Sequence, residues 1–133
     1  MKKSVKIAIV CIFVMFLFSS CVDPVYFNEN DLIGHWVTPS TNGQGTTGEL
    51  HFRYRADHSG VEWDTSDDVS EDESTMKFTW TVGVAKSDEL VHTYHQELGA
   101  DIPKYYTLVT LDATKLTYRD NFGKSFSFTR TDD

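Results

Sequence analysis

The segment from Asp64 to Glu73 has six carboxylates in ten residues, the densest group of potentially reactive side chains in the sequence. Carboxylate oxygens are ligands that calcium prefers, so a calcium-binding loop is one interpretation. However, the segment lacks the D-x-D-x-D-G spacing and contains no glycine for the sharp turn of such a loop. The pattern favours a solvated acidic turn between two strands.

Histidines are the second group of potential metal ligands, and they occur at positions 35, 51, 58, 92 and 95. His92 and His95 are three residues apart in a predicted strand, so we expect their side chains on opposite faces. His51 is expected to point outward, and His58 lies in a predicted turn. Because no spacing fits a zinc site, we expect neither a metal ion nor another cofactor.

Side chains for covalent catalysis are not arranged in any pattern that the sequence reveals. Ser59 and Ser87 lie in predicted turns without a nucleophile-elbow motif around them. The acidic pairs lie in predicted exposed loops rather than in a cleft. The sequence therefore predicts a protein that is not an enzyme.

Aromatic residues are the best candidates for contacts with a ligand, because many occupy alternate positions in predicted strands. We expect most of them to point into a common interior. There they either line a pocket for a small apolar or planar ligand or fill the core completely. The candidates for lining such a pocket are Phe52, Tyr54, Trp63, Phe78, Trp80 and Tyr106.

The elements that would position these rings are all predicted to be β-strands. In the clearest example, residues 49–55, Leu50, Phe52 and Tyr54 share one face and polar residues share the other. Loops are expected at 39–48 and 97–103, and a compact turn at 56–60 has Gly60 available for a left-handed conformation. Eight strands are predicted, at 31–38, 49–55, 61–63, 76–84, 90–95, 105–111, 116–118 and 126–130. Their short connections predict an all-β, antiparallel, up-and-down eight-stranded barrel.

The first twenty residues differ in kind from the rest of the chain. Lys2, Lys3 and Lys6 precede an unbroken apolar run over residues 7–18, and two small residues, Ser19 and Ser20, follow. This order is typical of a secretory signal peptide, and the run is shorter than the roughly 20 residues of a membrane-spanning helix. We therefore predict a signal peptide at 1–20, a tether at 21–30 and a barrel domain at 31–133.

Removal of that leader would leave a strongly acidic chain. Residues 21–133 contain nine basic and twenty acidic residues, which gives a net charge of −11. Nucleic acid is an unfavourable partner for such a surface, because Lys and Arg supply most of the affinity for phosphates. A cationic protein is a compatible partner, although high net charge also simply keeps a domain soluble.

The residues around Cys21 resemble the lipobox of bacterial lipoproteins. Phe18-Ser19-Ser20-Cys21 stands at the end of the apolar run, where that family is cut just before the cysteine. The resemblance implies that Cys21 carries a diacylglycerol on its thiol and an acyl chain such as palmitate on its amine. Several acyl chains would hold the protein on a membrane. The expected location is the bacterial cell envelope, at the outer membrane.

Both ends of the predicted barrel resemble lipocalins. Gly34-His35-Trp36 resembles the G-x-W signature of their first strand, and Arg130 lies where they keep an arginine packed over that tryptophan. The turn at 56–60 also resembles one in the lipocalin-like lipoproteins of Bacteroidetes. The resemblance covers residues 31–130 and implies that Trp36 and Arg130 close one end of the barrel.

The function that this resemblance implies is non-catalytic binding of a small hydrophobic or amphipathic ligand through the open end of the barrel. An alternative follows from the acidic charge. Small acidic barrel lipoproteins include inhibitors of cationic lysozymes, so the domain could instead bind a cationic protein.

Overall fold

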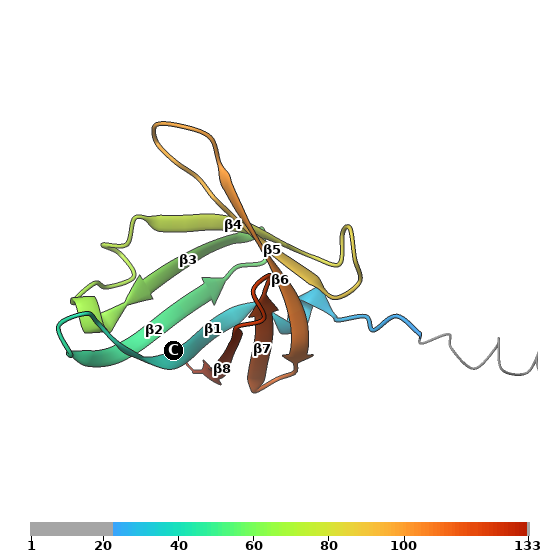
Figure 1. Ribbon diagram of the computed structural model, residues 1–133, viewed down its shortest axis with the longest axis horizontal. Helices are drawn as coiled ribbons and strands as arrows, with labels where there is room; N and C mark the ends of the chain where they lie inside the picture. The colour runs from blue at the N-terminus through green and yellow to red at the C-terminus, as the bar shows by residue number, and fades with distance from the viewer. Residues whose placement is uncertain (1–22, 133) are drawn as a thin grey trace, which may run out of the picture.

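Eight antiparallel strands follow one another in chain order around a closed barrel in the computed structural model, which describes residues 23–132 (Figure 1). The barrel closes because β1 pairs with β8 as well as with β2, with Trp36 opposite Arg130. The strands are β1 (Gly34–Thr41), β2 (Thr47–Tyr54), β3 (Ser59–Asp64), β4 (Met76–Val82), β5 (Glu89–Tyr94), β6 (Ile102–Leu111), β7 (Lys115–Asp120) and β8 (Ser125–Thr131). The predicted all-β, up-and-down barrel is thus confirmed.

Helical structure in residues 23–132 is limited to two single 3-10 turns, η1 (Glu29–Asp31) and η2 (Thr65–Asp67). No helix in this part of the chain is long and apolar enough to cross a membrane. The predicted signal peptide and the predicted lipidation site, Cys21, lie outside the described residues.

Two predicted loops are shorter than expected, because strands extend into them. β1 continues to Thr41 and β2 begins at Thr47, so the predicted loop at 39–48 shrinks to residues 42–46. In the same way β6 begins at Ile102, within the predicted loop at 97–103. Each extension contains a proline. Pro39 pairs only with a residue of β2, and Pro103 pairs only with a residue of β5. A strand tolerates a missing N–H donor at such a place.

The turn between β2 and β3 uses a residue other than the predicted glycine. His58 has a φ angle of 64° and supplies the left-handed conformation, whereas Gly60 lies within β3. A Cβ atom at Gly60 would come within 2.4 Å of the Phe78 ring. The glycine is therefore required by the packing of Phe78 and not by the turn.

One end of the barrel is closed by Trp36 and Arg130. The Trp36 side chain is completely buried, and the guanidinium carbon of Arg130 lies 4.4 Å from its ring centroid. The guanidinium also donates hydrogen bonds to the carbonyl oxygens of Ile33, at 2.6 Å, and of Asp31. Gly34 leaves room for this arrangement, since a Cβ atom there would lie 2.1 Å from Nη1 of Arg130. This end, which we call the closed end, is also where the chain enters β1.

Large side chains fill the middle of the barrel. The buried cluster comprises Leu32, Trp36, Phe52, Tyr54, Phe78, Trp80, Leu90, Tyr94, Leu108, Leu116, Tyr118 and Phe128. The alternation of strand residues directs these side chains inward. A ligand site inside the barrel would therefore lie toward the end opposite Trp36.

Candidate functional site at the open end of the barrel

The opposite end of the barrel, which we call the open end, is surrounded by the connections β1–β2 (42–46), β3–β4 (65–75), β5–β6 (95–101) and β7–β8 (121–124). Figure 1 shows that the β5–β6 connection extends away from the body of the barrel. Because the closed end is sealed by side chains, the open end is the direction from which the interior can be approached.

A carboxylate and several tyrosines converge inside this end. Glu62 is paired with Phe52 and so takes an inward position, where its Oε2 accepts a hydrogen bond of 2.5 Å from the Tyr94 hydroxyl. The rings of Tyr106 and Tyr118 lie nearby, with their centroids 4.6 Å apart. Burial, together with the Glu62 and Asp120 carboxylates, raises the pKa of Tyr106 to about 12. These tyrosines are therefore neutral hydroxyl groups at ordinary pH.

The hydroxyl groups of Tyr106 and Tyr118 differ from those of the other two interior tyrosines. Tyr94 donates to Glu62, and Tyr54 is hydrogen-bonded to His92. Within residues 23–132, no hydrogen-bond partner is present for the hydroxyls of Tyr106 and Tyr118. Both groups are thus available to a bound molecule.

His92 lies at the centre of the aromatic interior and is completely buried. Its ring centroid is 4.6 to 6.3 Å from those of six aromatic side chains, namely Phe52, Tyr54, Phe78, Tyr94, Tyr106 and Tyr118. Burial, with a smaller effect of the Lys104 charge, lowers the pKa of His92 to about 3. The imidazole is therefore neutral.

Only one of the two ring nitrogens of His92 has a hydrogen-bond partner. Nε2 lies 2.8 Å from the Tyr54 hydroxyl, whereas Nδ1 is buried without a partner among the described residues. The Tyr54 hydroxyl has no other acceptor among the described residues, so we assign it as the donor to Nε2, which places the proton of the neutral ring on Nδ1. Leaving a buried donor unsatisfied costs about 1–3 kcal/mol.

A pocket of about 420 Å³ opens beside Tyr106, between the start of β6 and the β7–β8 connection. Its walls include Lys104, Tyr106, Phe122 and Phe126. The ring of Tyr106 is half-buried and also contacts His92, with 5.1 Å between the ring centroids. Tyr106 therefore lies between this pocket and the buried histidine.

The rim of the pocket combines lysines with an exposed aromatic ring. Nζ of Lys104 lies 4.6 Å from the Tyr94 ring centroid, and Nζ of Lys124 lies 4.9 Å from that of Phe126. Oδ1 of Asp120 accepts hydrogen bonds of 2.9 Å from the backbone N–H groups of Phe122 and Lys124. This turn holds the Phe122 side chain 96% exposed at the edge of the pocket, where a bound molecule can contact it.

The six predicted pocket residues are not gathered in one place. Phe52, Tyr54 and Phe78 surround His92, and Tyr106 connects this group to the pocket. Trp80 is buried nearer the closed end, where its Nε1 donates to the Ser59 carbonyl over 3.1 Å.

The expected inward orientation of Trp63 is wrong. Phe52 pairs with Glu62, so Glu62 points inward and Trp63, opposite His51, points outward. Trp63 stacks on the His51 ring at 4.8 Å, and His35 lies 5.1 Å from Trp63. His51 points outward as predicted but is largely covered by this stack. The short alternation of residues 61–63 did not reveal which face was inward, because Val61 and Trp63 are buried on the outer side.

Sequence reasoning missed Glu62 and considered His92 only as a potential metal ligand. His92 could have been found from alternation alone, since Leu90, His92 and Tyr94 occupy one face of β5. Glu62 offered no such signal, because a carboxylate between two apolar residues is the usual pattern of an outward position.

The acidic segment at 64–73 is largely the solvated turn that we predicted, since four of its six carboxylates are exposed, but Asp64 and Glu71 attach it to the barrel. Glu71 forms ion pairs of 2.8 Å with Arg53 and 3.0 Å with Arg55, both on the outer side of β2 or directly after it. Asp64 accepts hydrogen bonds from the Ser40 hydroxyl, at 2.6 Å, and from the backbone N–H of Ser66, at 2.8 Å. These carboxylates are occupied in holding the segment in place.

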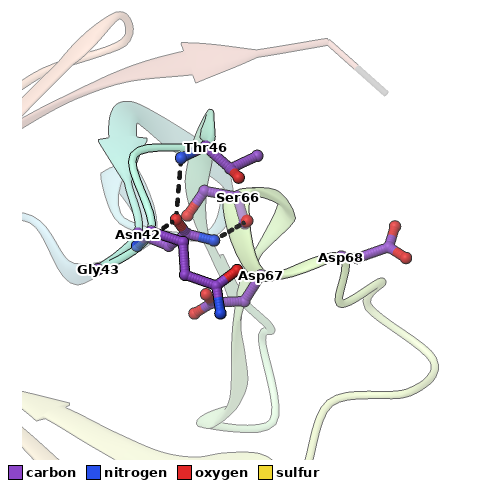
Figure 2. Close-up of a pocket in the computed structure, with 7 residues that line it drawn as sticks. Asn42, Gly43, Thr46, Ser66, Asp67 and Asp68 are labelled. Carbon is purple, nitrogen blue, oxygen red and sulfur yellow. Dashed lines mark hydrogen bonds between the residues drawn. The ribbon is translucent and has the colours of Figure 1, made fainter.

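A second pocket, of about 510 Å³, lies between the β1–β2 connection and η2 (Figure 2). The Asn42 side chain spans it, accepting from the backbone N–H of Thr46 at 2.9 Å and donating to the Ser66 carbonyl at 2.6 Å. Asp67 and Asp68 lie at its margin. Across residues 23–132 there is no group of three or more His, Cys, Asp or Glu side chains that could hold a metal ion.

The chain matches no protein-family model, and no curated protein or solved structure matches it. A function must therefore be based on the residues described above. Among the described residues, the open end combines a pocket, aromatic walls and hydroxyl groups without hydrogen-bond partners, which are usual components of a small-molecule site.

Proposed function

We propose that this protein is a lipid-anchored, lipocalin-like binding module of the bacterial cell envelope, and that its open end takes a small hydrophobic or amphipathic ligand without catalysing a reaction. One observation carries the proposal: Tyr106 lines the pocket of about 420 Å³ and also contacts the buried cluster around His92. Aromatic side chains make up half of the pocket lining, beside three polar or charged residues, a combination that suits a small amphipathic ligand.

The direction of the chain supports an anchored arrangement. Residues 23–33 lead into β1 at the closed end, beside Trp36 and Arg130. A lipid on Cys21 would thus attach the closed end to the membrane and leave the open end accessible. The lipobox-like residues and the preceding apolar run are the sequence features that support the anchor itself.

The first experiment is native mass spectrometry of residues 22–133, purified from cells without the lipid anchor. We expect an additional mass that organic extraction removes. The extracted protein should then bind the neutral apolar dye N-phenyl-1-naphthylamine saturably. A bare polypeptide mass together with no saturable dye binding would refute the proposal.

Matched variants locate the binding. Phe122 and Val84 are exposed apolar residues at opposite ends of the barrel, 96% and 77% exposed, so an aspartate at either position should leave the fold intact. Phe122→Asp is expected to weaken dye binding at least several-fold, and Val84→Asp is expected to leave it unchanged. Equal effects of both substitutions would place the dye elsewhere. Salt-sensitive binding to a cationic protein such as lysozyme, without dye binding, would instead favour the alternative function.

A further inference from the structure

The unsatisfied Nδ1 of His92 is the feature of the interior that packing alone does not explain. A phenyl ring would fill a similar space without burying a polar atom, and nearly all buried polar groups in folded proteins have a partner. The other ring nitrogen, Nε2, is hydrogen-bonded to the Tyr54 hydroxyl over 2.8 Å. The histidine is therefore held in a fixed orientation, with an N–H donor that nothing among the described residues accepts.

Tyr106 is the least constrained of the rings around this donor. Phe52, Phe78 and Tyr118 are each no more than 5% exposed, and Tyr54 and Tyr94 are fixed by hydrogen bonds. The Tyr106 ring is half-buried and its hydroxyl is not hydrogen-bonded within the described chain. Of these rings it is the one that also lines the pocket.

We propose that rotation of Tyr106 joins the pocket of about 420 Å³ to His92, and that the ligand is an uncharged, largely aromatic molecule whose carbonyl-type oxygen accepts the hydrogen bond of His92 Nδ1. This inference rests on the proposed function and names the ligand class of the same site. It also assigns His92 as the specificity-determining residue and Tyr106 as the side chain that controls access.

The polar groups near the path support a ligand that accepts hydrogen bonds. Tyr106 and Lys104 line the pocket, the ring centroid of Tyr118 lies 4.6 Å from that of Tyr106, and each of these three side chains carries a hydrogen-bond donor. The two nearby carboxylates already have partners, since Glu62 accepts from Tyr94 and Asp120 accepts from the β7–β8 backbone. The ammonium of Lys104 can only donate hydrogen bonds, so it favours a ligand that carries an acceptor.

The same groups argue against an anionic ligand. A carboxylate on the ligand would share a poorly solvated interior with the Glu62 charge, and like charges repel strongly where water is excluded. A neutral carbonyl avoids this repulsion. The surrounding rings favour an aromatic body, because ring pairs with centroids 4.5–7 Å apart add roughly 0.5–1.5 kcal/mol beyond the burial of their area.

The test compares two probes of nearly identical shape, 2-acetylnaphthalene and 2-ethylnaphthalene, of which only the ketone has an acceptor oxygen. We expect the ketone to bind wild-type protein about tenfold more tightly, as one buried hydrogen bond would give. His92→Phe should reduce this preference to near unity while 2-ethylnaphthalene still binds. Tyr106→Ala should accelerate association of the ketone, and the matched control Tyr26→Ala, at an exposed tyrosine, should not.

A measurement on wild-type protein keeps the inference testable even if His92→Phe does not fold. The imidazole ¹⁵N resonances of His92 should show Nδ1 protonated, and this signal should shift with 2-acetylnaphthalene but not with 2-ethylnaphthalene. Equal affinity for both probes, or ketone binding that leaves the His92 resonances unchanged, would overturn the inference and leave the proposed function standing. Failure of both probes and of the apolar dye to bind would instead refute the proposed function.

Discussion

His92 should make the stability of the barrel depend on acid in a way that a single substitution can reveal. Burial lowers the pKa of His92 to about 3 in the folded protein, whereas an unfolded chain titrates with the ordinary value of about 6.5. Below pH 6.5 the unfolded state therefore takes up a proton that the folded state does not. The free energy of unfolding is therefore unaffected by His92 above pH 6.5 and decreases as the pH falls from 6.5 toward 3.

The magnitude of this loss follows from the two pKa values. Between pH 7 and pH 4, protonation of the unfolded state alone favours unfolding by about 3 kcal/mol. A domain of this size is stable by only about 5–15 kcal/mol, so the effect is large.

The assay is urea denaturation of wild-type protein and of His92→Phe at pH 7 and pH 4. The wild type should lose about 3 kcal/mol more than the variant across this interval. Other groups also change the free energy of unfolding with pH. One is His51, whose pKa is lowered by burial and by His35. Their contributions are present in both proteins and cancel in the comparison.

His95 supplies the control, because His95→Asn removes an imidazole that is 48% exposed, and its pair with Asp101, at 3.1 Å, is equally exposed and contributes little. This variant is expected to lose the same stability as wild type between the two pH values, to within a few tenths of a kcal/mol. If wild type and His92→Phe lost equal stability, the assignment of His92 as a buried neutral base would be wrong.

Two further predictions concern the closed end and the acidic segment. Gly34→Ala should destabilise the fold by about 1–3 kcal/mol in urea denaturation, because φ at this position is 141° and the new Cβ would meet Arg130. The control is Gly43→Ala, where a Cβ meets nothing within 4 Å. Equal losses of stability in the two variants would refute the role assigned to Gly34. Glu71→Gln should cost under about 1 kcal/mol, less at high salt, because its ion pairs are partly exposed. A salt-independent loss above about 2 kcal/mol would show that this segment is part of the core.

The sequence determined the architecture of this protein through local chemistry. Alternating apolar residues such as Leu50, Phe52 and Tyr54 make strands that bury one face, and short connections between them leave an up-and-down order as the simplest solution. Strand ends were less well predicted. Pro39 and Pro103 signalled breaks, yet both lie in strands, because pairing with a single neighbour satisfies the backbone there.

Only the tertiary structure decided which polar residues came together. The register between β2 and β3 placed Glu62 inside and Trp63 outside, and a shift by one residue would have exchanged them. Closure of the barrel then brought Tyr54, from β2, to His92, from β5, across 38 residues of chain. Alternation along one strand fixes the face of a side chain relative to its neighbours. It carries no information on which distant side chain lies opposite, because that depends on pairing and packing around the whole barrel.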